Sequence, residues 1–283
     1  MGGERYLALV REGRNEGWRY VLSVVLIISC WLVLGYLPYY ALAAHGPLNR
    51  LTLYIAVNCS IFAMLVGLAL AMRFLHRRPL MTLVSAEQRF DWKRIVQAAA
   101  VWAAIGLTAA AIEHLLYPDR YYVTFDPGAF FVFAAIALVL TPIQTTAEEL
   151  LFRGYAMQAL SLVVRRPLAI AAVSALVFTL PHLLNPEVRQ AGMLVAASYY
   201  TIGFLLAVIT LRDGRLDLAL GVHAANNLGL ALIANYEGSA LTGESIFTAR
   251  ELDPVYTFFS LAAGSVLFYA FFFARRSTAA IKT

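Results

Sequence analysis

Eight apolar segments run through this chain, and their length limits how it can fold. Seven are windows of about 20 residues, long enough for a helix to cross about 30 Å of hydrocarbon. They cover approximately residues 20–42, 51–72, 95–116, 168–184, 191–211, 216–236 and 255–274. The eighth, 128–164, also contains charges. Only 14% of the 283 residues are charged, about half the usual fraction. We predict an all-α integral membrane bundle of about eight transmembrane helices, in one domain over 1–283.

The basic residues are shared unevenly between the loops, which predicts the orientation. With eight crossings, one alternate set of loops and ends holds 17 Lys and Arg residues, and the other holds four. The basic set comprises the N-terminus, 73–94, 165–166, 212–215 and the tail with Arg275, Arg276 and Lys282. Cytoplasmic loops carry the excess of basic residues, so both termini are expected in the cytoplasm. The net charge of +5 is then explained by topology and predicts no nucleic-acid partner.

Three polar clusters interrupt the apolar segments. They are Glu148, Glu149 and Arg153 in the stretch AEELLFRG, then Phe178 with His182, and then His223 with Asn227. A charge at the centre of a membrane helix costs about 2.5–3.5 kcal/mol, so such residues are candidates for function. Each cluster therefore needs an explanation beyond the apolar pattern.

The spacing within AEELLFRG separates its two carboxylates. Glu149 and Arg153 are four residues apart, with the acid before the base, and are expected to pair on one helix face. Glu148 is turned by about 100° around the axis and needs a different partner. We therefore predict that Glu149 is tied to Arg153 and that Glu148 is available for chemistry.

The segment 128–164 is too long for a straight crossing. As one helix it would measure about 55 Å, so we expect it to tilt, to bend near Pro142 or Gly154, or to break. With that allowance, the helical rise from the basic flanks brings four polar groups to the middle or inner part of the bilayer: Glu148, His182, His223 and Asn227.

Each cluster alone also fits packing, because buried histidines, asparagines and ion pairs often join membrane helices. Together, the three clusters also provide side chains that could act in catalysis. A carboxylate beside a histidine can hold a water and take its proton. A second histidine and an amide can stabilise the oxyanion of an attacked carbonyl. These are parts of a peptide-bond hydrolase without a Ser, Cys or Thr nucleophile. Zinc is the alternative, with Glu148, His182 and His223 as ligands, although the histidines lack HExxH spacing.

The three motifs resemble those of the CPBP family, the CAAX protease and bacteriocin-processing group also called Abi. The resemblance rests on Glu148-Glu149-x-x-x-Arg153, Phe178-x-x-x-His182 and His223-x-x-x-Asn227, in this order. It covers a core of about residues 90–240 and extends to the type II CAAX prenyl endopeptidases.

The resemblance implies an intramembrane endopeptidase of the glutamic type that needs no cofactor. In such an enzyme Glu148 and His182 activate the water, and His223 and Asn227 form the oxyanion hole. Glu149 and Arg153 support the site, and Phe178 packs against it. A zinc-dependent metalloprotease is the alternative enzyme.

The resemblance also implies the partners and location. The substrate is expected to be membrane-bound or prenylated, of the CAAX type or a peptide that is matured. The alternative is a catalytically silent scaffold or bacteriocin-immunity protein of the same family. A transporter that uses Glu148 and the histidines is less favoured, because the halves show no repeat symmetry. We expect a multi-pass protein in the bilayer of a bacterial or archaeal inner membrane.

Overall fold

The structure is a computed structural model that describes residues 2–279, with side chains for residues 2–274. Lys282 and the side chains of Arg275 and Arg276, which contribute to the basic tail, lie outside the described residues.

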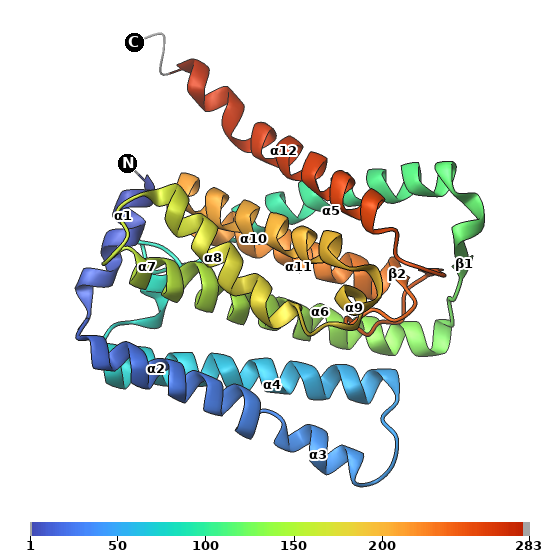
Figure 1. Cartoon of the computed structure of the whole chain (residues 1–283), viewed down its shortest axis with the longest axis horizontal. Helices are drawn as coiled ribbons and strands as arrows, with labels where there is room; N and C mark the ends of the chain where they lie inside the picture. The colour runs from blue at the N-terminus through green and yellow to red at the C-terminus, as the bar shows by residue number, and fades with distance from the viewer. Residues whose placement is uncertain (1, 280–283) are drawn as a thin grey trace.

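A helical segment occupies each of the eight apolar ranges (Figure 1). The first four are α2 (Gly17–Ser29) with η2 (Cys30–Leu34) and α3 (Leu37–Ala43), α4 (Arg50–Leu70) with η3 (Ala71–His76), α5 (Trp92–Leu116), and α6 (Pro127–Glu149) with η6 (Leu150–Ala156) and α7 (Met157–Leu160). The other four are α8 (Pro167–His182), α10 (Met193–Asp213), α11 (Asp217–Leu232) and α12 (Pro254–Ala279). The elements η2, η3 and η6 are π-helical.

Six of these segments are long and apolar enough to cross a membrane, which confirms an all-α, multi-pass membrane protein. They are Gly17–Ala43, Arg50–His76, Trp92–Leu116, Pro127–Leu160, Met193–Asp213 and Pro254–Ala274. The other two, α8 and α11, have 16 residues each. Each is about 24 Å long, shorter than the hydrocarbon core. The count of eight crossings therefore stays a prediction.

The predicted long segment continues without a break, because η6 carries the helix from α6 into α7 through a π-helical stretch. Of the expected tilt, bend or break, the break is therefore excluded. One predicted boundary changes. The predicted span 216–236 was too long, since α11 ends at Leu232 and residues 234–236 form a strand. Apolar composition does not distinguish the end of a helix from a short buried strand.

Short elements close the two ends of the bundle. They are α1 (Gly2–Ala8), η1 (Leu9–Glu12), η4 (Leu80–Leu83), η5 (Pro118–Arg120), α9 (Pro186–Ala191) and the strands β1 (Tyr121–Val123), β2 (Ala234–Tyr236) and β3 (Phe247–Ala249). The strands form one sheet in the order β1-β3-β2, with β1 antiparallel and β2 parallel to β3. Thr248 is the register partner of both Tyr122 and Asn235.

At the end of the bundle that holds the N-terminus, three segments meet (Figure 1). The fully buried Tyr6 of α1 donates from its hydroxyl to the carbonyl of Leu83, at 2.6 Å, and to that of Arg153, at 3.1 Å. Burial raises the pKa of Tyr6, so the hydroxyl stays protonated and able to donate. The loop after α10 joins them, because the Leu216 N–H donates to the carbonyl of Val84.

At the opposite end the small sheet ties the loop before α6 to the loops that flank β3. The N–H of Ala240 donates to the buried carboxylate of Glu187 on α9, at 3.1 Å. The loops at the two ends of the bundle thus correspond to the two alternate sets of loops in which Lys and Arg residues were counted. Which end faces the cytoplasm stays a prediction.

Helices in the centre of the bundle pack closely at two glycines. Helix α11 lies against α5 so tightly that a Cβ on Gly221 would stand 2.2 Å from the carbonyl oxygen of Ile95. Helix α10 approaches α8 at Gly203, where a Cβ would stand 3.0 Å from the ring of Phe178. These contacts hold two of the motif helices, α11 and α8, against their neighbours α5 and α10. Large apolar side chains such as Val25 and Phe131 are exposed on the outer faces, as in a lipid-facing surface.

Candidate active site

The first motif lies where α6 passes into η6. Glu148 and Glu149 are the last residues of α6, and Arg153 follows in η6. The Arg153 guanidinium donates to Glu149 Oε1 at 2.8 Å and to the carbonyl of Gly203 on α10 at 3.2 Å. The side chains of Glu149 and Arg153 are fully buried. The predicted ion pair is present, and loss of either partner would leave an uncompensated buried charge.

His223 of α11 joins the two glutamates. Its Nδ1 lies 2.7 Å from Glu149 Oε1, and its Nε2 lies 3.7 Å from Glu148 Oε2. A carboxylate only accepts hydrogen bonds, so Nδ1 is the donor and carries a proton. The Nε2 separation exceeds hydrogen-bond range and suits a group that bridges the two side chains. The two carboxylates therefore share a neighbour, which their spacing on α6 did not predict.

His182 is the last residue of α8 and lies between two aromatic rings. The ring centroids of Phe178 and Tyr199 are each 4.5 Å from that of His182. Its Nδ1 is 2.8 Å from the carbonyl oxygen of Phe178. Because a carbonyl only accepts, Nδ1 is the protonated nitrogen, and in a neutral ring Nε2 is then an acceptor. This is the tautomer that a base requires.

The two asparagines of the third motif have different neighbours. Asn226 accepts a hydrogen bond from Trp102 Nε1 of α5 at 3.3 Å, and its own amide donates to Asn227 Oδ1 at 3.3 Å. The oxygen of Asn227 is thereby occupied. Within residues 2–279 its NH2 group has no hydrogen-bond partner. Asn227 is therefore the better placed of the two to donate to a ligand.

Phe178 connects all three motifs. Its ring packs against His182 in a tilted arrangement, lies 5.9 Å from the ring of His223, and is covered by the Arg153 guanidinium at 4.3 Å. The three motif segments thus converge around one buried aromatic ring. The packing expected of Phe178 is present, and the functional roles of the other residues are taken up below.

Two neighbours of this centre were not predicted. Gln144 donates from Nε2 to Glu148 Oε1 at 3.2 Å. It lies one turn before Glu148, so the spacing of four residues was a usable signal. Tyr199 of α10 stacks on His182, and its hydroxyl donates to the buried carboxylate of Glu187. Its role depends on the packing of α10 against α8, for which the sequence has no local signal.

The suggested zinc ligands do not form a ready metal site. No group of three or more His, Cys, Asp or Glu side chains within the described part of the chain is arranged to hold a metal ion. Glu148 Oε2 and His223 Nε2 lie 3.7 Å apart, and Nδ1 of each histidine is bonded, to Glu149 in His223 and to a main-chain carbonyl in His182. Bonds of this kind also orient histidines that bind a metal through the other nitrogen, so the two Nε2 atoms and Glu148 stay available as ligands.

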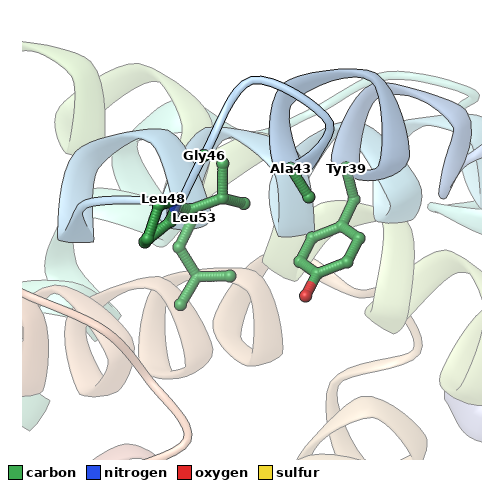
Figure 2. A pocket seen from close by; sticks show the side chains of 6 residues that line it. Tyr39, Ala43, Gly46, Leu48 and Leu53 are labelled. Carbon is green, nitrogen blue, oxygen red and sulfur yellow. The ribbon is translucent and has the colours of Figure 1, made fainter.

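A separate cavity lies away from the motifs. It has a volume of about 510 Å³ and is formed by α3, the following turn and the start of α4 (Figure 2). Its lining is Tyr39, Ala43, Gly46, Pro47, Leu48 and Leu53, and it shares no residue with the three motifs. The cavity is therefore separate from the candidate site.

The fold and this buried polar centre define a multi-pass membrane protein with ionisable groups at its core, a pattern typical of a functional site. The family model described as type II CAAX prenyl endopeptidase Rce1-like matches residues 127–229, a range that contains all three motifs. An uncharacterized protein of Bacillus subtilis (strain 168), YyaK, is 30% identical over 282 residues, which cover 91% of this chain and 94% of that protein.

The chain therefore belongs to the Rce1-like type II CAAX prenyl endopeptidase family. The resemblance drawn from the motif letters is confirmed. The family supports a membrane endopeptidase, and the protein is an integral, multi-pass membrane protein.

Proposed function

We propose that this chain is an intramembrane endopeptidase in which Glu148 and His182 activate a water. The observation that carries the proposal is the convergence of the three motif segments around Phe178. That arrangement brings two carboxylates and two imidazoles close to one buried ring, and Asn227 follows one helical turn after His223 on α11. Charges and dipoles act strongly where they are buried from water, which supports the proposal.

The proposed reaction begins with a water held by Glu148 and by Nε2 of His182. Glu148 takes a proton while the water oxygen bonds to the carbonyl carbon of the substrate. The carbonyl oxygen becomes negative and accepts hydrogen bonds from the Asn227 NH2 group and from His223 Nε2. The C–N bond then breaks, and the proton on Glu148 passes to the leaving amine.

The oxyanion role sets a condition on His223. Its Nδ1 already donates to Glu149, so a second N–H at Nε2 exists only if the ring carries both protons. Glu148, Glu149 and Arg153 together leave one net negative charge, which a protonated His223 would neutralise. Glu149 and Arg153 then serve as supports that fix the ring, with Phe178 packed against them.

Substitution of Glu148 tests the proposal. The probes are quenched fluorescent peptides that end in a farnesylated cysteine and three further residues, and the same peptides without the lipid. Glu148→Ala is expected to lower the cleavage rate by about 100-fold to 10,000-fold, because the base is lost. Glu87→Ala, at an exposed carboxylate at the end of the bundle, is the matched control and should keep the rate within about twofold.

Two results would contradict the proposal. Cleavage that continues in Glu148→Ala would remove this residue from the reaction. If the wild-type protein cleaves no probe, and Glu148→Ala restores the phenotype of a deletion strain as well as wild type does, the protein acts as a scaffold. Cleavage of lipid-free peptides alone would point to peptide maturation and away from a prenylated substrate.

We propose that the reaction needs no metal, with zinc as the tested alternative. Purified active protein is expected to contain less than about 0.1 mole of zinc per mole by elemental analysis, and a chelator should leave the rate unchanged. A zinc enzyme would instead contain about one ion held by Glu148, His182 and His223, and would lose activity with the ion. Stoichiometric zinc, with activity that returns on re-addition, would overturn the metal-free proposal.

A further inference from the structure

Gln144 is a buried polar residue next to the reactive carboxylate and has no part in the three motifs. Only 9% of its surface is exposed. It lies one helical turn before Glu148, and its Nε2 donates to Glu148 Oε1 at 3.2 Å. A charged acceptor of this kind strengthens a hydrogen bond, so Gln144 restrains the rotation of the Glu148 carboxylate.

The orientation of the Gln144 amide follows from this contact. If the amide were rotated by half a turn, its oxygen would face a carboxylate oxygen, and two acceptors would repel each other. Nε2 therefore points to Glu148 and Oε1 points away. The Oε1 atom is buried and has no hydrogen-bond partner among the described residues.

Burial of an oxygen without a donor is unfavourable, and most buried polar atoms in folded proteins have a hydrogen-bond partner. The missing partner must be an N–H or O–H group. A peptide whose scissile carbonyl reaches the water on Glu148 also brings its neighbouring main-chain N–H groups close, because successive residues are at most about 3.3–3.6 Å apart along an extended chain. An extended peptide bound at Glu148 would therefore bring N–H groups of the kind that Oε1 lacks.

We propose that Gln144 has two functions: Nε2 positions Glu148, and Oε1 accepts a hydrogen bond from a main-chain N–H of the substrate. The proposal rests on the proposed peptidase function. It assigns to the site a substrate in an extended conformation that is recognised through its backbone, independently of the side chains beside the scissile bond.

A chemical double-mutant cycle tests the contact. The probes are the farnesylated peptides and versions in which one amide at a time, other than the scissile one, is replaced by an ester, which removes one N–H. Binding is measured by fluorescence anisotropy with protein that carries Glu148→Gln, which cannot cleave but retains the shape of the side chain. Gln144→Met, nearly isosteric but without donor or acceptor, is the paired variant in the same background.

One ester position is expected to weaken binding about tenfold with Gln144 present, and less than about twofold with Gln144→Met. In otherwise wild-type protein, Gln144→Met should also lower kcat, because Glu148 is less restrained. Ester effects that are equal in both backgrounds would overturn the contact. A fall in kcat without any ester coupling would assign Oε1 to the hydrolytic water and also overturn it.

If the peptidase proposal is wrong, the experiment gives a different result from the one that contradicts the role of Gln144. If the probes bind but are never cleaved, the peptidase proposal fails, while the ester cycle still reports on Gln144. If no peptide binds, no substrate N–H reaches Oε1 and the inference fails. Thermal unfolding of Gln144→Met within about 3 °C of the parent serves as the folding control.

Discussion

Asn226 and Asn227 are neighbours in the chain with different partners in the structure. The indole of Trp102 donates to Asn226, and Asn226 in turn donates to the oxygen of Asn227. That leaves the NH2 group of Asn227 without a hydrogen-bond partner among the described residues, as the proposed oxyanion donor requires. The two residues therefore provide a matched test of the oxyanion assignment, one acting on the substrate and one on its neighbour.

Asn227→Ala is expected to lower kcat by about 100-fold or more, corresponding to about 2.7 kcal/mol of transition-state stabilisation, with a small effect on KM. The loss falls on kcat because the oxyanion exists only in the transition state. Steady-state kinetics with the fluorescent peptides measure both parameters.

The control is Asn226→Ala, which removes the contact with Trp102 and should cost less than about tenfold in kcat. The reverse order of the two effects would assign the donor to Asn226. An unchanged rate in Asn227→Ala would remove the amide from the oxyanion hole altogether.

At the scale of residues, local spacing predicted the local contacts. Glu149 and Arg153 pair as their separation of four predicts, and Phe178 meets His182 in the same way. The bond from His223 to Glu149 joins residues 74 positions apart. No periodicity within one helix contains that contact, because it depends on how α11 packs against α6.

At the scale of elements, the close packing of α11 against α5 holds His223 in place. Gly221 lies two residues before His223, and a Cβ there would stand 2.2 Å from the carbonyl oxygen of Ile95 and 2.8 Å from the Cβ of Ala98. A backbone oxygen cannot move aside as a flexible side chain can. The glycine is therefore required by close approach of the two helices.

Gly221→Ala is expected to force the helices apart and to destabilise the protein by about 1–3 kcal/mol. It should also lower activity, because His223 moves with the helix. Thermal unfolding in detergent and the peptide assay measure the two effects.

Gly229→Ala, on the same helix, is the matched control, since a Cβ there meets nothing within 4 Å. It should be neutral or stabilising by up to about 1 kcal/mol, because alanine is the better helix former. Equal losses in the two variants would indicate that the close approach at Gly221 does not determine the effect.

Element boundaries were less predictable than element positions. Each apolar range contains a helix, because long apolar segments need internal hydrogen bonds in lipid. Apolar composition alone predicts neither the π-helical stretches nor the strands. A π-helical turn differs from an α-helical one only in its hydrogen bonds, and strand β2 is identified by its partner β3, which begins more than ten residues later.

At the scale of the whole molecule, the two sets of loops predict the orientation. Contacts place the segment around Glu87 at the end that holds α1, and the segment around Glu251 beside the sheet at the opposite end. The excess of Lys and Arg belongs to the first set. We expect that end, with both termini, in the cytoplasm of a bacterial or archaeal cell.

Cysteine labelling checks this orientation. In a background without Cys30 and Cys59, Glu251→Cys should react with a membrane-impermeant maleimide in intact cells, and Glu87→Cys should react only after the cells are permeabilised. Both positions are exposed, so access and not burial decides the result. Labelling in the opposite order would reverse the orientation. Labelling of both in intact cells would show that the loops do not lie on opposite sides.

Helix α1 has a consequence for how the protein is made. Tyr6 bonds to the carbonyls of Leu83 and Arg153, which lie 77 and 147 residues later in the chain, and Gly3 packs against Leu211. At about 5–20 residues per second, roughly 10–40 s separate the synthesis of Gly3 from that of Leu211. Helix α1 therefore leaves the ribosome well before the partners that it packs against. Helix α1 can dock only on a bundle that already contains η6, the segment with Arg153.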